Sequence, residues 1–197
     1  MQHNKAVDLI GKGVQRGDTA WADLGSGDGT FTRALRELLG PDADIYAVDV
    51  DGSTLKSQKK VLGSHADLSK THLIEADFRR PLELPPLDGM LLANALHFVQ
   101  DQITVLSQLR GHLKPSGRLL VVEYDITRGS MWVPHPLPFR TLVRLAPAAG
   151  FQPPVLLATT PSRFRSQIYS ALAVTGERRH REMSRPEANF ADRGGSR

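Results

Sequence analysis

The chain has 197 residues, which fits one domain with a buried core of ordinary size. It contains no cysteine, and this excludes disulfides, thiolate zinc sites and a thiol nucleophile. The formal net charge is a modest +4, and part of the excess lies after Gly176, so the charge alone does not indicate a nucleic-acid partner.

The first half of the chain alternates between strand-like and helix-like segments. In order, we expect a strand at 19–24, a helix at 31–39, a strand at 45–49, a helix at 53–62 and a strand at 72–76. Gly40-Pro41 predicts where the first helix stops, because neither residue continues a helix well. A proline-rich connection follows the third strand.

The second half continues this alternation. We expect strands at 89–93 and 118–123, the second after a turn at 114–117, then a helix at 139–149 and strand-like runs at 154–159 and 165–174. Between the first two strands we predict a helix whose apolar face carries Ile103, Leu106, Leu109 and Leu113. The last two runs have no long helix between them, which predicts an antiparallel pair at the edge of the sheet.

This order of elements predicts an α/β fold of the Rossmann-like, doubly wound type. Successive strand-helix units form a parallel sheet, and the helices cover both of its faces. We expect a seven-stranded, mostly parallel sheet with an antiparallel edge strand. Residues 1–176 would form a single domain, and the arginine-rich residues 177–197 a flexible basic tail.

A glycine-rich turn joins the first strand to the first helix and would let the backbone approach a nucleotide-like ligand. Its pattern is Gly25-x-Gly27-x-Gly29 after Asp23, whereas the dinucleotide fingerprint is G-x-G-x-x-G. The third glycine therefore comes one position too early for a nicotinamide cofactor. Asp49 ends the second strand, where a carboxylate can bind a ribose diol through two charge-assisted hydrogen bonds.

Five segments in this order resemble the class I S-adenosylmethionine-dependent methyltransferases, and within them the methyltransferase type 11 or ubiquinone/menaquinone-type group. The segments are Trp21–Thr30, Tyr46–Asp49, Glu75–Phe78, Leu91–Val99 and Leu113–Leu120. The resemblance covers roughly residues 15–175 and makes the single domain a methyltransferase domain. It implies S-adenosylmethionine as the cofactor, S-adenosylhomocysteine as its product, and no metal.

The resemblance also implies which residues hold this cofactor. The methionine part would be wrapped by Asp23, Leu24 and the loop residues Gly25, Ser26, Gly27 and Gly29. Asp49 would bind the ribose hydroxyls, Asp77 would accept from the adenine amino group, and Phe78 or Val50 would flank the adenine ring. Asn94 would lie near the amino-acid end and the methyl group. Each assignment has a simpler alternative. The glycines can form an ordinary turn, Asp49 and Asn94 can cap helices, and Asp77 can end a loop.

Methyl transfer from a sulfonium is an in-line displacement, so the protein mainly aligns the acceptor and excludes water. A base is needed only where the acceptor must lose a proton. The candidates near substrate are His97, Tyr124 and His135, the last in an aromatic and proline-rich connection that would roof the site. The alternative for each histidine is a surface or packing role.

The leading hypothesis is an enzyme that methylates an oxygen, nitrogen or carbon atom of a small molecule. The alternatives are a methyltransferase for a protein or RNA acceptor, which the basic tail would help to bind, and a non-catalytic binding module of the same fold. A nicotinamide-dependent oxidoreductase is disfavoured by the glycine spacing. The start of the chain lacks a signal-peptide core and no stretch is long enough to span a bilayer, so we expect a cytoplasmic protein without a membrane partner.

The sequence departs from the family pattern in two places. Few residues precede the first strand, so a cap over the substrate must come from a short helix at Val7–Ile10, from residues 125–138 or from a second subunit in a homodimer. Ser116 stands where the family usually has glycine, a change that we expect a type I or II turn to tolerate.

Overall fold

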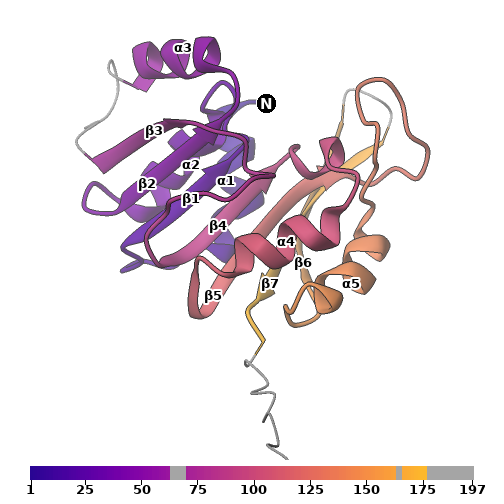
Figure 1. Cartoon of the computed structure of the whole chain (residues 1–197). Helices are drawn as coiled ribbons and strands as arrows, with labels where there is room; N and C mark the ends of the chain where they lie inside the picture. Colours follow the sequence, from indigo (N-terminus) through magenta and orange to yellow (C-terminus); the bar gives the residue numbers. More distant parts are fainter. Residues whose placement is uncertain (63–69, 163–165, 177–197) are drawn as a thin grey trace, which may run out of the picture.

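The computed structural model describes residues 1–62, 70–162 and 166–176, and its centre is one seven-stranded sheet (Figure 1). The strands are β1 Ala20–Leu24, β2 Asp44–Asp49, β3 Thr71–Glu75, β4 Leu87–Ala93, β5 Leu113–Tyr124, β6 Val155–Pro161 and β7 Gln167–Val174. Their spatial order is β3-β2-β1-β4-β5-β7-β6. Strands β1 to β5 pair in parallel, while β7 runs antiparallel to both β5 and β6. The expected fold class is confirmed, and the predicted basic tail lies outside the described residues.

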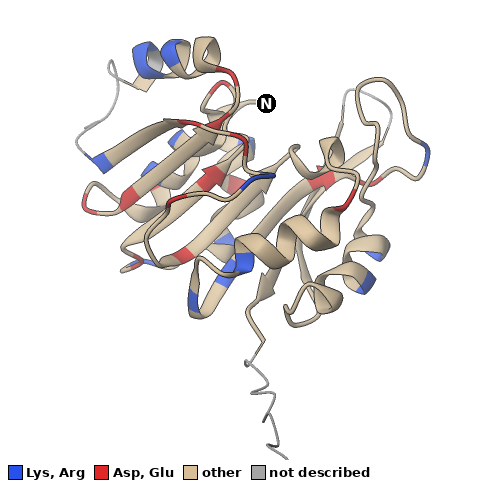
Figure 2. Ribbon diagram, in the orientation of Figure 1, with Lys and Arg blue, Asp and Glu red and all other residues tan. Residues whose placement is uncertain are grey.

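Helices cover both faces of this sheet (Figure 1). They are α1 His3–Ile10, α2 Thr30–Leu39, α3 Gly52–Leu62, α4 Gln102–Arg110 and α5 Phe139–Ala148. Helices α1 and α2 pack together behind the sheet, and α4 and α5 lie in front of it. The exposed lysines of α3 face solvent (Figure 2). In the described residues no helix is long and apolar enough to cross a bilayer.

Successive residues of the central strands enter two different cores, because side chains alternate across a sheet. Trp21 and Leu91 pack into the core under α1 and α2, whereas Ala22 and Met90 pack into the core under α4 and α5. Both sets are fully buried. This double burial explains why the strands read as nearly continuous apolar runs in the sequence.

The structure corrects the predicted apolar face of α4. Leu113 is the first residue of β5 rather than a member of the helix, and the side chain of Ile103 is 41% exposed. The buried face is formed by Val105, Leu106 and Leu109. The proline-rich connection predicted after the third strand is confirmed, because residues 76–86 between β3 and β4 contain no helix.

The predicted turn at 114–117 is an irregularity within β5. The pairing of β4 with β5 jumps from Leu87↔Leu113 to Gly89↔Arg118, and Ser116 has a φ of 61°. This left-handed conformation is costly for a residue with a Cβ and free for glycine.

We expect Ser116→Gly to stabilise the chain by roughly 0.5 to 1 kcal/mol, because glycine adopts a positive φ without steric cost. Urea unfolding measures the change. The matched control is Ser107→Gly in the exposed part of α4, which should destabilise by up to about 1 kcal/mol. Equal destabilisation by both substitutions would contradict this account.

Candidate functional site

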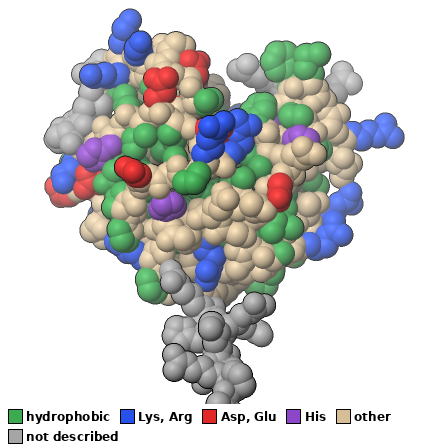
Figure 3. All heavy atoms as spheres, in the orientation of Figure 1, with side chains coloured by type: hydrophobic (Ala, Val, Ile, Leu, Met, Phe, Trp, Pro, Cys, Tyr) green, Lys and Arg blue, Asp and Glu red, His purple; other side chains and the backbone are tan. Residues whose placement is uncertain are grey.

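A cavity of about 500 Å³ opens at the carboxyl ends of β1, β2 and β4. Strands β1 and β4 are neighbours, but α2 after β1 and α4 after β4 lie on opposite faces, so the connections diverge and leave a crevice (Figure 1). Figure 3 shows this edge of the molecule as a notch between two lobes. The residues that line the cavity are Met1, Asp23, Gly25, Ser26, Gly27, Asp28, Thr30, Phe31, Asp49, Val50, Ala76, Asp77, Phe78, Arg79, Ala93, Asn94, Ala95 and Phe98.

The glycine loop forms one wall of the cavity, and its conformation requires glycine at two points. Gly25 has a φ of 77°, and a Cβ there would come within 2.8 Å of the Cβ of Ala95 on the opposite wall. Gly27 has a φ of 53°, and its N–H donates to Asp49 Oδ2 at 2.8 Å. The loop therefore approaches both the turn after β4 and the end of β2.

Two of the residues predicted to bind a cofactor do not line the cavity. Leu24 is fully buried in the core, because it faces the α4 side of β1. Gly29 supports the loop from behind, where a Cβ would collide with the side chain of Gln58 at 2.5 Å. The other nine predicted residues are brought together around one space.

Asp23 is a buried carboxylate at the end of β1. Its Oδ2 accepts a hydrogen bond from the Thr32 hydroxyl at 2.7 Å, while its Oδ1 is buried and has no partner in the described residues. Burial raises the pKa of Asp23 to about 7, against the smaller opposite effect of the Thr32 hydrogen bond. A carboxylate in this state strongly favours a ligand that brings a cationic donor.

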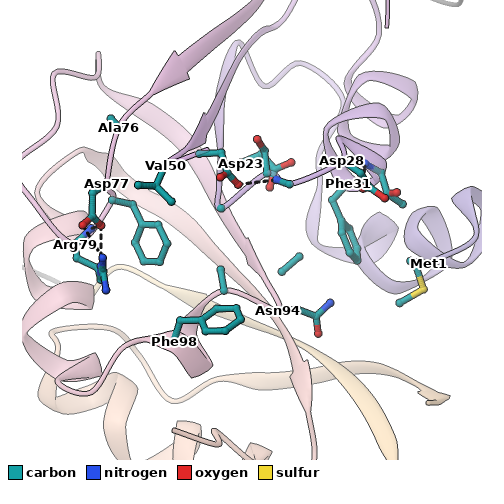
Figure 4. A pocket seen from close by; sticks show the side chains of 18 residues that line it. Met1, Asp23, Asp28, Phe31, Val50, Ala76, Asp77, Arg79, Asn94 and Phe98 are labelled. Atoms are coloured by element: carbon teal, nitrogen blue, oxygen red, sulfur yellow. Dashed lines mark hydrogen bonds and ion pairs between the residues drawn. The ribbon is translucent and has the colours of Figure 1, made fainter. Parts of the chain in front are cut away.

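Asn94 directly follows the adjacent strand β4, and its side chain carries a second buried oxygen that can accept a hydrogen bond. It has a φ of 53°, unusual outside glycine, and its N–H donates to the carbonyl of Val122 at 2.7 Å. Its Oδ1 is buried and lacks a partner in the part of the chain that the structure describes. Asp23 and Asn94 both line this cavity (Figure 4), and each has a buried side-chain oxygen that lacks a donor among the described residues.

The charges around the cavity are mainly negative. Asp23, Asp28, Asp49 and Asp77 contribute carboxylates, and Arg79 is the cationic side chain among the lining residues. Both oxygens of Asp49 already accept backbone N–H groups, from Gly27 at 2.8 Å and from Asp51 at 2.9 Å. These bonds fix the orientation of Asp49 at the cavity and leave lone pairs for a ligand's hydroxyl groups.

The far end of the cavity is an apolar slot closed by an ion pair. Phe78, Val50 and Phe98 surround the slot (Figure 4), and the last two are 66% and 55% exposed although apolar. Arg79 donates to both oxygens of Asp77 at 2.8 Å, and this pairing lowers the pKa of Asp77. An exposed apolar slot next to a fixed carboxylate suits a flat heterocycle with an amino group.

Several lining residues were not predicted from the sequence, chiefly Phe98, Phe31 and Arg79. Phe98 lies inside the segment Leu91–Val99 that carried the resemblance, so its position could have been noticed there. Phe31 read only as an apolar residue of the first helix. Nothing in the sequence showed that either aromatic ring borders a cavity.

The three residues predicted near substrate lie outside this cavity. His97 is buried, with its Nδ1 at 2.7 Å from Glu123 Oε2 and its backbone N–H bonded to Glu123 Oε1 at 3.1 Å. His135 donates its backbone N–H to the carbonyl of His97 at 2.9 Å and lines neither this cavity nor the neighbouring one. Tyr124 lines that neighbouring cavity, which shares Met1 and Asn94 with the first.

The expected roof over the site is also not formed by residues 125–138, none of which lines the cavity. Ser130 and Val133 close a tight turn, and it presents Met131 and Trp132 to solvent at 89% and 73% exposure. The turn is held away from the crevice because Val133 and Leu137 are anchored in the protein interior.

The chain is similar in sequence and in fold to known methyltransferases. A family model described as a methyltransferase domain matches residues 22–119. The ubiquinone/menaquinone biosynthesis C-methyltransferase UbiE of Pasteurella multocida is 28% identical over 114 residues, 57% of this chain and 42% of that protein. UbiE of Teredinibacter turnerae is 29% identical over 120 residues, 60% of this chain and 48% of that protein. The chain spans less than half the length of these curated relatives.

Solved structures share the fold at low sequence identity. Phosphoethanolamine N-methyltransferase 2 of Haemonchus contortus, in complex with S-adenosyl-L-methionine, has a TM-score of 0.71 at 13% identity, covering 88% of this chain and 52% of that one. The CurJ carbon methyltransferase has a TM-score of 0.68 at 20% identity, covering 82% and 49%.

The raised pKa of Asp23 gives a stability prediction. An unfolded chain ionises this carboxyl near pH 4 and the folded chain only near pH 7, so stability falls as the pH rises across this window, by up to about 4 kcal/mol. We expect Asp23→Asn to raise the free energy of unfolding at pH 8 by roughly 2 kcal/mol and to flatten its decline between pH 4 and 7.

Chemical denaturation at a series of pH values measures this effect. Asp28→Asn, an exposed change in the same loop, should alter the unfolding free energy by less than about 0.5 kcal/mol. A destabilised Asp23→Asn variant at pH 8 would show that the carboxylate contributes to folding rather than opposing it.

Proposed function

Because this chain belongs to the class I S-adenosylmethionine-dependent methyltransferases, we propose that it transfers a methyl group from S-adenosylmethionine to an oxygen, nitrogen or carbon atom of a small-molecule acceptor. The observation that carries this proposal is that Asp23 and Asn94, which both line an acidic cavity, each have a buried oxygen, Oδ1, without a partner among the described residues. The cofactor has both an ammonium group, which supplies N–H donors, and a cationic sulfonium.

The lining residues fit this cofactor along its whole length. Asp23, Asn94 and the loop at Gly25–Gly27 would hold its methionine part, and the oriented carboxylate of Asp49 its ribose hydroxyls. Phe78, Val50 and Phe98 would enclose the adenine ring, with Asp77 beside its amino group. A nicotinamide dinucleotide fits worse, because its pyrophosphate would lie among four carboxylates.

The cofactor supplies an activated methyl group on sulfur. The acidic residues of the cavity would stabilise the cationic form of the bound cofactor. We infer that Tyr124 is the predicted residue nearest the acceptor, since it lines the cavity beyond Asn94.

In this proposal the buried pair of His97 and Glu123 positions other residues and does not contact the substrate. It fixes the turn after β4, which carries Asn94 at one end and Phe98 at the other. The bond from His135 N–H to the carbonyl of His97 ties the following loop to the same turn. The two histidines thus hold cofactor-binding residues in place.

Calorimetry with S-adenosylhomocysteine tests the cofactor assignment. We expect S-adenosylhomocysteine to bind and NADH not to bind comparably. Asp49→Ala should weaken the binding free energy of S-adenosylhomocysteine by roughly 1.5 to 3 kcal/mol, because it removes charge-assisted hydrogen bonds. Asp42→Ala is a control, because Asp42 is exposed and lines no part of the cavity. Tighter binding of NADH than of S-adenosylhomocysteine would refute the proposal.

The affinity for S-adenosylhomocysteine should also depend on pH. A cationic ammonium beside Asp23 favours the ionised carboxylate, whose pKa in the free protein is about 7. Binding therefore releases a proton below pH 7, and the affinity rises as the pH increases from 6 to 7.5. Calorimetry in two buffers of different ionisation enthalpy counts this proton, and Asp23→Asn should abolish its release.

A further inference from the structure

A second cavity lies beside the first at the same edge of the sheet. Its lining residues come from the start of α1, the ends of β4, β5 and β6, and the start of β7, and they are Met1, Gln2, Lys5, Asn94, Tyr124, Thr160, Pro161, Ser162 and Ile168. Asn94 and Met1 line both cavities. A molecule in the second cavity would therefore meet the cofactor across Asn94, at the cofactor's reactive end.

The two cavities carry opposite charge. The first has four carboxylates and one guanidinium, whereas among the described residues Lys5 is the single charged side chain that lines the second. Lys5 makes no ion pair within the described residues, although Asp8 follows it by three positions on the same helix. Its ammonium group is thus available to a ligand in this cavity.

The place of Lys5 on α1 is unfavourable for the helix itself. It lies in the first turn, near the positive end of the helix dipole, and this turn contains no acidic residue. Gln2 at the N-cap makes no side-chain hydrogen bond to the helix. Helix stability therefore gives no reason for a cation at this position.

The remaining surface of the cavity combines apolar, hydroxyl and amide groups. Ile168 and Pro161 offer apolar contact, Tyr124 offers an aromatic ring, and Thr160 is a possible hydrogen-bond donor. This combination suits a ligand with an apolar body and a single anionic group.

We propose that the second cavity binds the methyl acceptor and that the acceptor is an organic anion whose anionic group is held by Lys5. The inference rests on the proposed methyltransferase function and specifies its substrate class. The ammonium of Lys5 attracts an anion, and the acidic first cavity keeps that anion from occupying the cofactor's place. The body of the acceptor then lies against Tyr124 and Ile168, next to Asn94.

Binding of a simple probe tests this assignment without turnover. Benzoate added to the chain saturated with S-adenosylhomocysteine should shift the NMR signals of Tyr124 and Ile168, and benzamide, its uncharged counterpart, should not. Lys5→Gln should weaken benzoate binding at least fivefold and leave S-adenosylhomocysteine binding intact. Lys12→Gln is the matched control, because Lys12 is exposed and lines neither cavity.

The outcomes separate the two proposals. Equal shifts from benzamide, no shift from benzoate, or unchanged benzoate affinity in Lys5→Gln would overturn the anionic assignment even where the cofactor binds. Failure to bind S-adenosylhomocysteine would instead count against the methyltransferase function itself.

A turnover experiment gives a second, independent readout. The chain is incubated with methyl-labelled S-adenosylmethionine and a pool of small metabolites, and the products are separated by anion exchange. We expect the label in the retained, anionic fraction, with at least a fivefold lower rate for Lys5→Gln and an unchanged rate for Lys12→Gln. Label in the unretained fraction would overturn the inference while leaving methyl transfer established.

Discussion

The site depends on one buried carboxylate, that of Asp23 near the end of β1, which has no cation beside it among the described residues. Thr32 of α2 donates to this carboxylate, Gln58 of α3 donates to Thr32, and Gln58 also accepts from Ser26 in the glycine loop. A chain of buried hydrogen bonds therefore connects the strand, two helices and the loop. These hydrogen bonds are stronger in a buried setting than in water, and they fix the position of the glycine loop. The loop therefore keeps its conformation beside a carboxyl group whose burial favours the protonated form.

Much of the fold, and most of the residues that surround the first cavity, could be predicted from the sequence. Parallel strands end at one edge of a sheet, so Asp23, Asp49 and Asn94 had to converge once their segments were identified as strands. Leu24 and Gly29, also predicted to bind the cofactor, do not line the cavity, and the reasons are local. The side chain of Leu24 packs into the core on the α4 side of the sheet. Gly29 lies against Gln58, where a Cβ would collide with the glutamine side chain.

What the sequence could not reveal depends on contacts between distant segments. His97 looked like a residue near substrate, but the pairing of β4 with β5 places Glu123 against its ring, and the ring is then buried. Leu113 has helical spacing from Leu109, yet its pairing with Leu87 makes it part of β5. The acidic character of one cavity and the lone lysine of the other arise only when four or five separate segments meet.

The position of β7 bears on how the sheet is completed. This strand, late in the sequence, lies between β5 and β6, and in the described residues β6 pairs with β7 alone. During synthesis β6 must therefore wait for β7, and until residue 174 has left the ribosome β5 has an open edge that another chain could pair with. Until β7 pairs with it, β5 presents an unpaired strand edge beside the cavity that Tyr124 lines, and an unpaired edge is where another chain can add a strand.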